Sequence, residues 1–150
     1  MRILMVCLGN ICRSPLAEGI LQDKIASRGL DWQVDSAGTG HWHVGDRPDS
    51  RSVAVARRYG IDITGQRGRQ FKPQDFERFD HILVMDDQNL RDVLRQAQSD
   101  EQRAKVRLIL DYSHPSGGRV VPDPYYDDDG FEQVFQMLDE ACDAFIEQHL

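Results

Sequence analysis

The chain has 150 residues, of which 40% are hydrophobic and 29% charged, and its formal net charge is −7 at pH 7. This length fits one domain with one hydrophobic core, which we expect to span residues 1–150. The acidic balance and the lack of a dense Lys and Arg cluster argue against nucleic acid as a partner, and no apolar run approaches the roughly 20 residues that cross a bilayer. Three cysteines without a secretory signal argue against a disulfide framework, so we expect reduced thiols, a cytoplasmic location and no membrane partner.

Short apolar runs alternate with amphipathic stretches along the chain. The runs predict buried strands at 3–6, 32–34, 82–85 and 106–110, and the stretches predict helices at 15–28, 49–59, 73–78, from 86 to about 97, and at 131–149. Helical crossovers between strands are right-handed and make neighbouring strands parallel. The pattern therefore predicts a three-layer α/β domain whose four-stranded parallel sheet has the order 2-1-3-4, with helices on both faces. In such folds ligands bind at the carboxyl end of the first strand, where the order reverses.

The stretch that follows the first predicted strand reads Cys-Leu-Gly-Asn-Ile-Cys-Arg-Ser and covers residues 7–14. A tight loop between a strand and a helix directs backbone N–H groups and the positive end of the helix dipole at one spot, which makes an anion site. Gly9 and Asn10 reach a positive φ at low cost, so the loop can curl. Arg13 offers a planar fork of donors to phosphate oxygens, and Cys7 offers a nucleophile whose thiolate the same field stabilises.

A reaction at phosphorus needs a second group, because the leaving oxygen must receive a proton. The best candidate is Asp123 in the stretch Pro-Asp-Pro-Tyr-Tyr at 122–126, where the flanking prolines stiffen the backbone. The carboxylates at 127–129 are expected instead to be solvated, close to the N-terminus of the last helix, where negative charge is favourable. Ser14 is expected to cap the first helix and to bring its hydroxyl to the sulfur of Cys7.

The stretch CLGNICRS at position 7, together with Asp-Pro-Tyr-Tyr from position 123, resembles the signature of the low-molecular-weight protein tyrosine phosphatases. The resemblance implies hydrolysis of phosphotyrosine monoesters through a cysteinyl-phosphate, with Cys7 as nucleophile, Arg13 as phosphate clamp and Asp123 as general acid and then base. It implies a phosphotyrosine-containing protein or a small aryl phosphate as substrate and inorganic phosphate as product. No metal and no cofactor is needed.

The resemblance also implies which residues bind the substrate. Apolar walls for an aromatic ring are expected from Leu8, Ile11, Trp42, Tyr125 and Tyr126. The other substrate-binding residues that the resemblance implies are Gly9, Asn10, Cys12 and Ser14, and Ser36 is implied as a structural support that braces the loop. A half-buried loop position for Trp42 and a plain turn role for Ser36 are the alternatives.

Cys12 lies five positions after Cys7 in the same loop. A disulfide requires Cα atoms within about 7 Å, which a loop curled around one phosphate allows. In the family this second cysteine protects the nucleophile from over-oxidation, so the resemblance implies a reversible redox switch. A small buried side chain without a redox role is the alternative. Cys142 is expected in the core, and His41 and His43 are expected to be exposed loop residues without a metal.

Other functions on this fold remain to be weighed. An arsenate reductase relays oxidation through additional cysteines, and the chain has none between Cys12 and Cys142. A protein-arginine phosphatase resembles this chain but carries Thr where Ile11 stands, and a bulky apolar residue there favours an aryl phosphate. A non-catalytic phosphoprotein-binding or redox-sensing module would be favoured if Cys7 or Asp123 were absent, and both are present.

Overall fold

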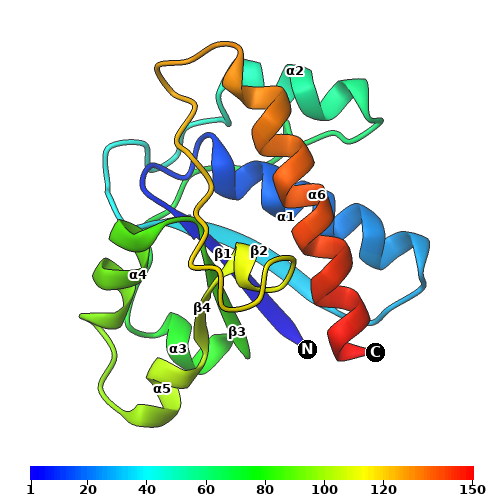
Figure 1. The fold of residues 1–150 in the computed structure, drawn as a ribbon. Coiled ribbons are helices and arrows are strands. Elements are labelled where there is room, and N and C mark those ends of the chain that lie inside the picture. The colour runs from blue at the N-terminus through cyan, green and yellow to red at the C-terminus, as the bar shows by residue number, and fades with distance from the viewer.

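The computed structural model describes residues 1–150, and its strands form one sheet (Figure 1). The strands are β1 (Arg2–Cys7), β2 (Gln33–Gly38), β3 (His81–Val84) and β4 (Val106–Leu108). All neighbouring strands are parallel and the order is β2-β1-β3-β4. The predicted fold class and strand order are therefore confirmed, and β1 is central because its neighbours β2 and β3 pair with its two edges.

Helices cover both faces of this sheet (Figure 1). They are α1 (Arg13–Ser27), α2 (Ser50–Arg58), α3 (Asp75–Arg78), α4 (Asp87–Leu94), α5 (Asp100–Ala104) and α6 (Gly130–His149), with a 3-10 turn η1 (Ile109–Asp111) after β4. Side chains of β1 alternate between two clusters, since Ile3 and Met5 pack with α1, α2 and α6, while Leu4 and Val6 pack with α3 and α4. Both faces of β1 are therefore buried, which is typical of a parallel sheet. None of the helices combines the length and apolarity that a membrane crossing requires.

The structure differs from the prediction at two places in the second half of the chain. The helix α5 was not predicted, because none of its residues is buried and it therefore carries no apolar period. The fourth strand ends at Leu108, two residues early. Leu108 packs on the α4 side of the sheet, whereas Ile109 and Leu110 both pack on the α6 side. Two consecutive residues on one side are incompatible with strand alternation, so the apolar run continues as a 3-10 turn.

The end of β2 determines where the 7–14 loop begins. β2 runs four residues further than predicted, and its last residue, Gly38, pairs with Cys7 at the end of β1. Just beyond it, Thr39 N donates to Cys7 O at 2.9 Å and Gly40 N donates to Leu8 O at 2.9 Å. A Cβ on Gly38 would lie 2.8 Å from Leu8 O and 3.1 Å from Asn10 N. The loop backbone thus lies directly on a glycine, with no room for a side chain.

We expect Gly38→Ala to displace the 7–14 loop, because a backbone carbonyl at 2.8 Å cannot rotate away as a side chain could. Overpacking of this kind costs about 1–3 kcal/mol, so the thermal midpoint falls and stabilisation by inorganic phosphate weakens. Thermal unfolding with and without phosphate measures both effects. Gly65→Ala is the control, because a Cβ there meets nothing within 4 Å. Equal midpoints and equal phosphate shifts for the two variants would contradict the prediction.

Candidate active site

The 7–14 loop curls between the end of β1 and the start of α1, and Asn10 makes the turn. Asn10 has φ 57°, in the left-handed region, whereas Gly9 does not use the positive φ open to it. The Asn10 backbone N–H points at the sulfur and lies 3.3 Å from Cys7 Sγ. The backbone N–H groups of Leu8, Gly9, Ile11 and Cys12 make no hydrogen bond within the protein. The curl therefore leaves several donors available to an anion beside the sulfur.

A chain of hydrogen bonds behind the loop orients the sulfur. Asn10 Nδ2 donates to Ser14 Oγ at 2.8 Å and to Ser36 Oγ at 3.0 Å, which uses both of its hydrogens. Ser36 Oγ in turn donates to Glu18 Oε1 at 2.6 Å. Since Ser14 Oγ accepts from Asn10, its own hydrogen is free to donate to Cys7 Sγ, 3.0 Å away. The series of hydrogen bonds that starts at Glu18 thus ends in a donor directed at the sulfur of Cys7.

The role expected for Ser14 as helix cap is wrong. Helix α1 begins at Arg13, its N-cap position is Cys12, and no side chain makes a capping hydrogen bond there. The hydroxyl of Ser14 is occupied by Asn10 and Cys7, so it is not available to the helix. The other contact predicted for Ser14, between its hydroxyl and the sulfur of Cys7, is present in the structure.

Arg13 comes from the first turn of α1 and is buried with only 2% of its side chain exposed. Its Nη1 donates to Asp86 Oδ2 at 2.6 Å and to Val121 O at 3.0 Å. Burial alone would lower the pKa of Arg13, but the negative groups Cys7, Asp86 and Asp123 raise it above its ordinary value. The guanidinium therefore remains charged inside the protein, and Asp86 holds it in one orientation.

Asp123 lies across the cavity from the loop, with Oδ2 3.8 Å from Arg13 Nη2. Its other oxygen accepts from Tyr125 N at 3.1 Å, which ties the carboxylate to its own segment. The side chain is 44% exposed, in contrast to the buried Arg13. A carboxylate so placed can reach a group that is bound above the sulfur.

The second cysteine of the loop has a different character from the first. Burial raises the pKa of Cys12 to about 12, and the negative charges of Asp49, Cys7 and Asp123 act in the same direction. At neutral pH Cys12 is therefore almost entirely a thiol, which makes it a weak nucleophile. Both cysteines are free, as is Cys142, which is buried in the core as predicted.

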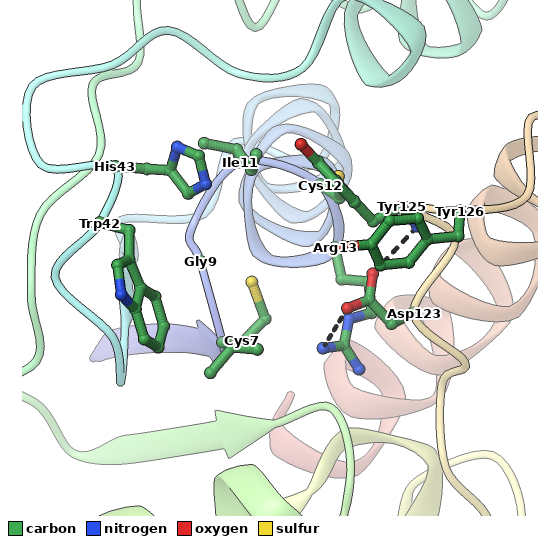
Figure 2. Close-up of a pocket in the computed structure, with 11 residues that line it drawn as sticks. Cys7, Gly9, Ile11, Cys12, Arg13, Trp42, His43, Asp123, Tyr125 and Tyr126 are labelled. Atoms are coloured by element: carbon green, nitrogen blue, oxygen red, sulfur yellow. Dashed lines mark hydrogen bonds and ion pairs between the residues drawn. The ribbon is translucent and has the colours of Figure 1, made fainter.

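A cavity of about 260 Å³ opens above the sulfur (Figure 2). Its lining consists of Cys7, Leu8, Gly9, Ile11, Cys12, Arg13, Trp42, His43, Asp123, Tyr125 and Tyr126. Trp42 and His43 lie on one side, and Asp123, Tyr125 and Tyr126 on the other (Figure 2). The structure thus brings the predicted site residues together around one cavity, except that the side chains of Asn10, Ser14 and Ser36 contact one another away from its lining. At the rim Trp42 is 64% and Tyr126 97% exposed.

His43 is a lining residue that the sequence analysis missed. It was expected to be an exposed loop residue, but its ring packs over the 7–14 loop, where a Cβ on Gly9 would lie 3.2 Å from His43 Cδ2. His43 Nδ1 is 3.0 Å from Asp46 Oδ2, which orients the ring. The only signal in the sequence is its place next to Trp42, and this does not distinguish a lining residue from its neighbour His41.

These features fit a hydrolase that acts on phosphate esters, and the chain belongs to the family of low molecular weight phosphotyrosine protein phosphatases, whose family model matches residues 2–150. The predicted family is confirmed. The chain is therefore a protein tyrosine phosphatase, a hydrolase that dephosphorylates phosphoproteins.

Relatives and solved structures agree with this assignment. A Synechocystis chain that carries the family's name is 48% identical over 145 residues, which cover 95% of this chain and 92% of its own. The low molecular weight phosphotyrosine protein phosphatase of Sus scrofa is 41% identical over 150 residues, with 97% and 94% covered. The crystal structure of a protein tyrosine phosphatase from Entamoeba histolytica has a TM-score of 0.92 at 35% identity, with 99% and 96% covered. A structure described as a drosophila arginine phosphatase has a TM-score of 0.92 at 34% identity, with 99% and 98% covered.

Glu18, at the far end of the hydrogen-bond chain, is a second residue that the sequence analysis missed. Burial raises its pKa from 4.5 to about 7, and the charge of Asp35 acts in the same direction. The hydrogen bond from Ser36 and the charge of Arg69 oppose this shift without cancelling it. Glu18 therefore takes up a proton in the folded protein at a pH where the unfolded chain has lost it.

This raised pKa predicts a pH-dependent stability. Between about pH 4.5 and 7 the folded state binds more protons at Glu18 than the unfolded state, so the free energy of unfolding falls as the pH rises. Relative to Glu18→Gln, the wild type should lose on the order of 2–3 kcal/mol across this window. Urea unfolding at pH 5, 6, 7 and 8 measures the difference. The exposed Glu140→Gln is the matched control variant, and a stability difference between wild type and Glu18→Gln that stays constant over this pH range would contradict the prediction.

Proposed function

We propose that this phosphatase works by covalent catalysis in two steps. Cys7 Sγ attacks phosphorus, the S–P bond forms as the P–O bond to the substrate breaks, and Asp123 gives its proton to the leaving oxygen. Asp123 then takes a proton from water, whose oxygen bonds to phosphorus as the S–P bond breaks and inorganic phosphate is released. The observation that carries this proposal is the convergence of Cys7, Arg13 and Asp123 on one cavity.

The positive charge that stabilises the transferring phosphoryl group is proposed to come from the chain itself. Arg13 supplies a guanidinium held by Asp86, and the loop supplies backbone N–H groups that have no partner within the protein. Donors fixed in advance need no reorganisation as charge moves onto the equatorial oxygens. The proposal therefore includes no metal and no cofactor in either step.

The substrate is proposed to be a phosphotyrosine-containing protein, with small aryl phosphates accepted as well. Trp42 on one side and Tyr125 and Tyr126 on the other can flank an aromatic ring, and Ile11 and Leu8 add apolar surface from the loop. Gly9, Asn10, Cys12 and Ser14 are proposed to form or support the phosphate cradle, with Ser36 bracing Asn10.

We further propose that residues 1–150 act as a single phosphatase domain in the cytoplasm. Both hydrophobic clusters share the one sheet, which supports a single unit. All three cysteines are free, and a nucleophile that must be a thiolate requires a reducing compartment.

A second candidate is protein-arginine phosphatase activity, since one structural neighbour is described as an arginine phosphatase. The cavity here favours the aryl phosphate. Ile11 contributes an apolar side chain to the lining and offers no hydrogen-bond partner to a guanidinium. The two candidates are separated by the choice of substrate and not by the mechanism at Cys7.

We expect the wild type to release phosphate from phosphotyrosine faster than from phosphoserine or phosphoarginine. Cys7→Ser should be inactive on all three because the nucleophile is lost, and Asp123→Asn should lower kcat/KM on phosphotyrosine by about 10²–10⁴-fold because no proton is supplied. A phosphate-release assay measures all rates. Asp127→Asn, a neighbouring exposed carboxylate, is the control for Asp123. Equal rates for wild type and Cys7→Ser would refute the covalent mechanism, and fastest release from phosphoarginine would favour the second candidate.

We also propose a reversible redox switch between Cys7 and Cys12. Peroxide oxidises the Cys7 thiolate to a sulfenic acid, and the Cys12 sulfur then displaces water to form a disulfide that a dithiol can reduce. Because the pKa of Cys12 is raised to about 12, the second step should be slower than the first.

The switch predicts a difference between wild type and Cys12→Ser after a matched dose of hydrogen peroxide. Wild type should regain most of its activity on addition of dithiothreitol, whereas Cys12→Ser should not, since its sulfenic acid oxidises further without a partner. Residual activity and intact mass report recovery and oxidation state. Equal recovery by the two proteins would assign Cys12 a packing role only.

A further inference from the structure

The segment 122–129, which carries Asp123 and both tyrosines of the rim, is held to the rest of the protein by few polar contacts. Within the segment, Tyr125 N, Asp127 N and Asp129 N donate to oxygens of the same segment. From outside, only two side chains reach it by a hydrogen bond or ion pair. Arg13 Nη2 lies 3.8 Å from Asp123 Oδ2, and Arg51 Nη1 donates to Asp128 Oδ1 at 2.6 Å. Arg51 is therefore one of only two outside side chains that hold this segment by a polar contact.

Arg51 lies in the first turn of α2 and is itself rigidly held. Its Nε and Nη2 donate to the two oxygens of Asp49 at 3.0 and 2.9 Å, and its backbone N donates to Asp49 Oδ1 at 2.8 Å. The guanidinium lies 5.5 Å from the ring centroid of Tyr125 and 4.6 Å from that of Phe131. A planar fork that pairs with two carboxylates and contacts two rings is a role that Lys cannot fill.

The N-terminus of α2 is also bonded to the 7–14 loop. Asp49 N donates to Ile11 O at 2.8 Å, and Ser52 Oγ donates to Cys12 O at 3.2 Å. A continuous polar path thus runs from the loop that carries the nucleophile, through Asp49 and Arg51, to Asp128 in the segment that carries the acid. In Figure 1 this segment passes beside α2 before it enters α6.

We propose that Arg51 is a positioning residue for the general acid, holding the 122–129 segment so that Asp123 faces the leaving oxygen above Cys7. It touches neither substrate nor the reacting atoms and acts through Asp128 and the ring of Tyr125. The proposal rests on the proposed role of Asp123. It predicts that loss of Arg51 impairs proton donation while phosphate binding by the 7–14 loop and Arg13 is retained.

The dependence on the leaving group tests this role. In Arg51→Met, kcat/KM for phosphotyrosine should fall about 10-fold or more, within the range that general acid catalysis contributes. For p-nitrophenyl phosphate it should fall less than about 3-fold, since that weakly basic phenolate departs with little protonation. The inhibition constant of inorganic phosphate should stay within about 2-fold, because Arg13 and the loop amides are unchanged. Arg58→Met is the matched control, as Arg58 lies on the same helix, is 66% exposed and forms its ion pair with Glu132 instead of with the 122–129 segment.

A double-mutant cycle with Asp123→Asn separates positioning from a general structural effect. If Arg51 acts through Asp123, Arg51→Met should change kcat/KM on phosphotyrosine less than about 3-fold in the Asp123→Asn background. Equal fold losses in both backgrounds, equal losses on both substrates, or a weakened phosphate inhibition would overturn the proposal. Arg51→Lys gives the same comparison if Arg51→Met does not fold. An Asp123→Asn protein as active as wild type would instead refute the general-acid role on which the proposal rests.

Discussion

The site depends on one side chain, the carboxamide of Asn10, and on the left-handed backbone that it stabilises. The left-handed φ of 57° has a small cost even for Asn, and here the amide offsets that cost by bonding Ser14 on α1 and Ser36 on β2, while its Oδ1 accepts from Arg69 N at 3.0 Å. Three separate parts of the fold thus hold one turn. Because the side chain and not the loop backbone makes these bonds, backbone N–H groups of the loop remain free to bind an anion.

The attraction between this protein and a phosphate group must come from charges within the site, because the chain as a whole is acidic. With a net charge of −7, long-range attraction does not draw a phosphate dianion to the surface. Instead one buried guanidinium and the loop dipoles act at short range in a poorly solvated site, where they are strongest. Asp86 fixes Arg13 Nη1 and also caps α4 by accepting from Asn89 N at 2.9 Å, so the residue that starts this helix also holds the guanidinium in place.

Local patterns predict much of this molecule, and contacts made by the fold account for what they miss around the site. The sheet order follows from alternating strands and helices, and the interest in the 7–14 loop and in Asp123 follows from two short motifs, at 7–14 and 122–126. The misplaced cap at Ser14 and the unpredicted Glu18 and His43 share another cause. Each depends on a partner that the folded chain brings near. Glu18 accepts a hydrogen bond from Ser36, and His43 packs over the 7–14 loop. The hydroxyl of Ser14 contacts the sulfur of Cys7 and not the terminus of the helix. Polar side chains alone do not reveal which partner they will meet.

The hydrogen bonds of Arg13 connect the proposed phosphate-binding role of this residue with the proposed proton donation by Asp123. Nη1 is committed to Asp86 and Val121, so Nη2 and Nε are the donors left for phosphate oxygens. Nη2 is also the atom that lies 3.8 Å from Asp123. A phosphate that takes this donor competes with the carboxylate for it and brings its own negative charge close to Asp123. In the proposed mechanism one guanidinium nitrogen therefore serves both partners, since the donor offered to the phosphoryl group also lies next to the carboxylate that gives the leaving oxygen its proton.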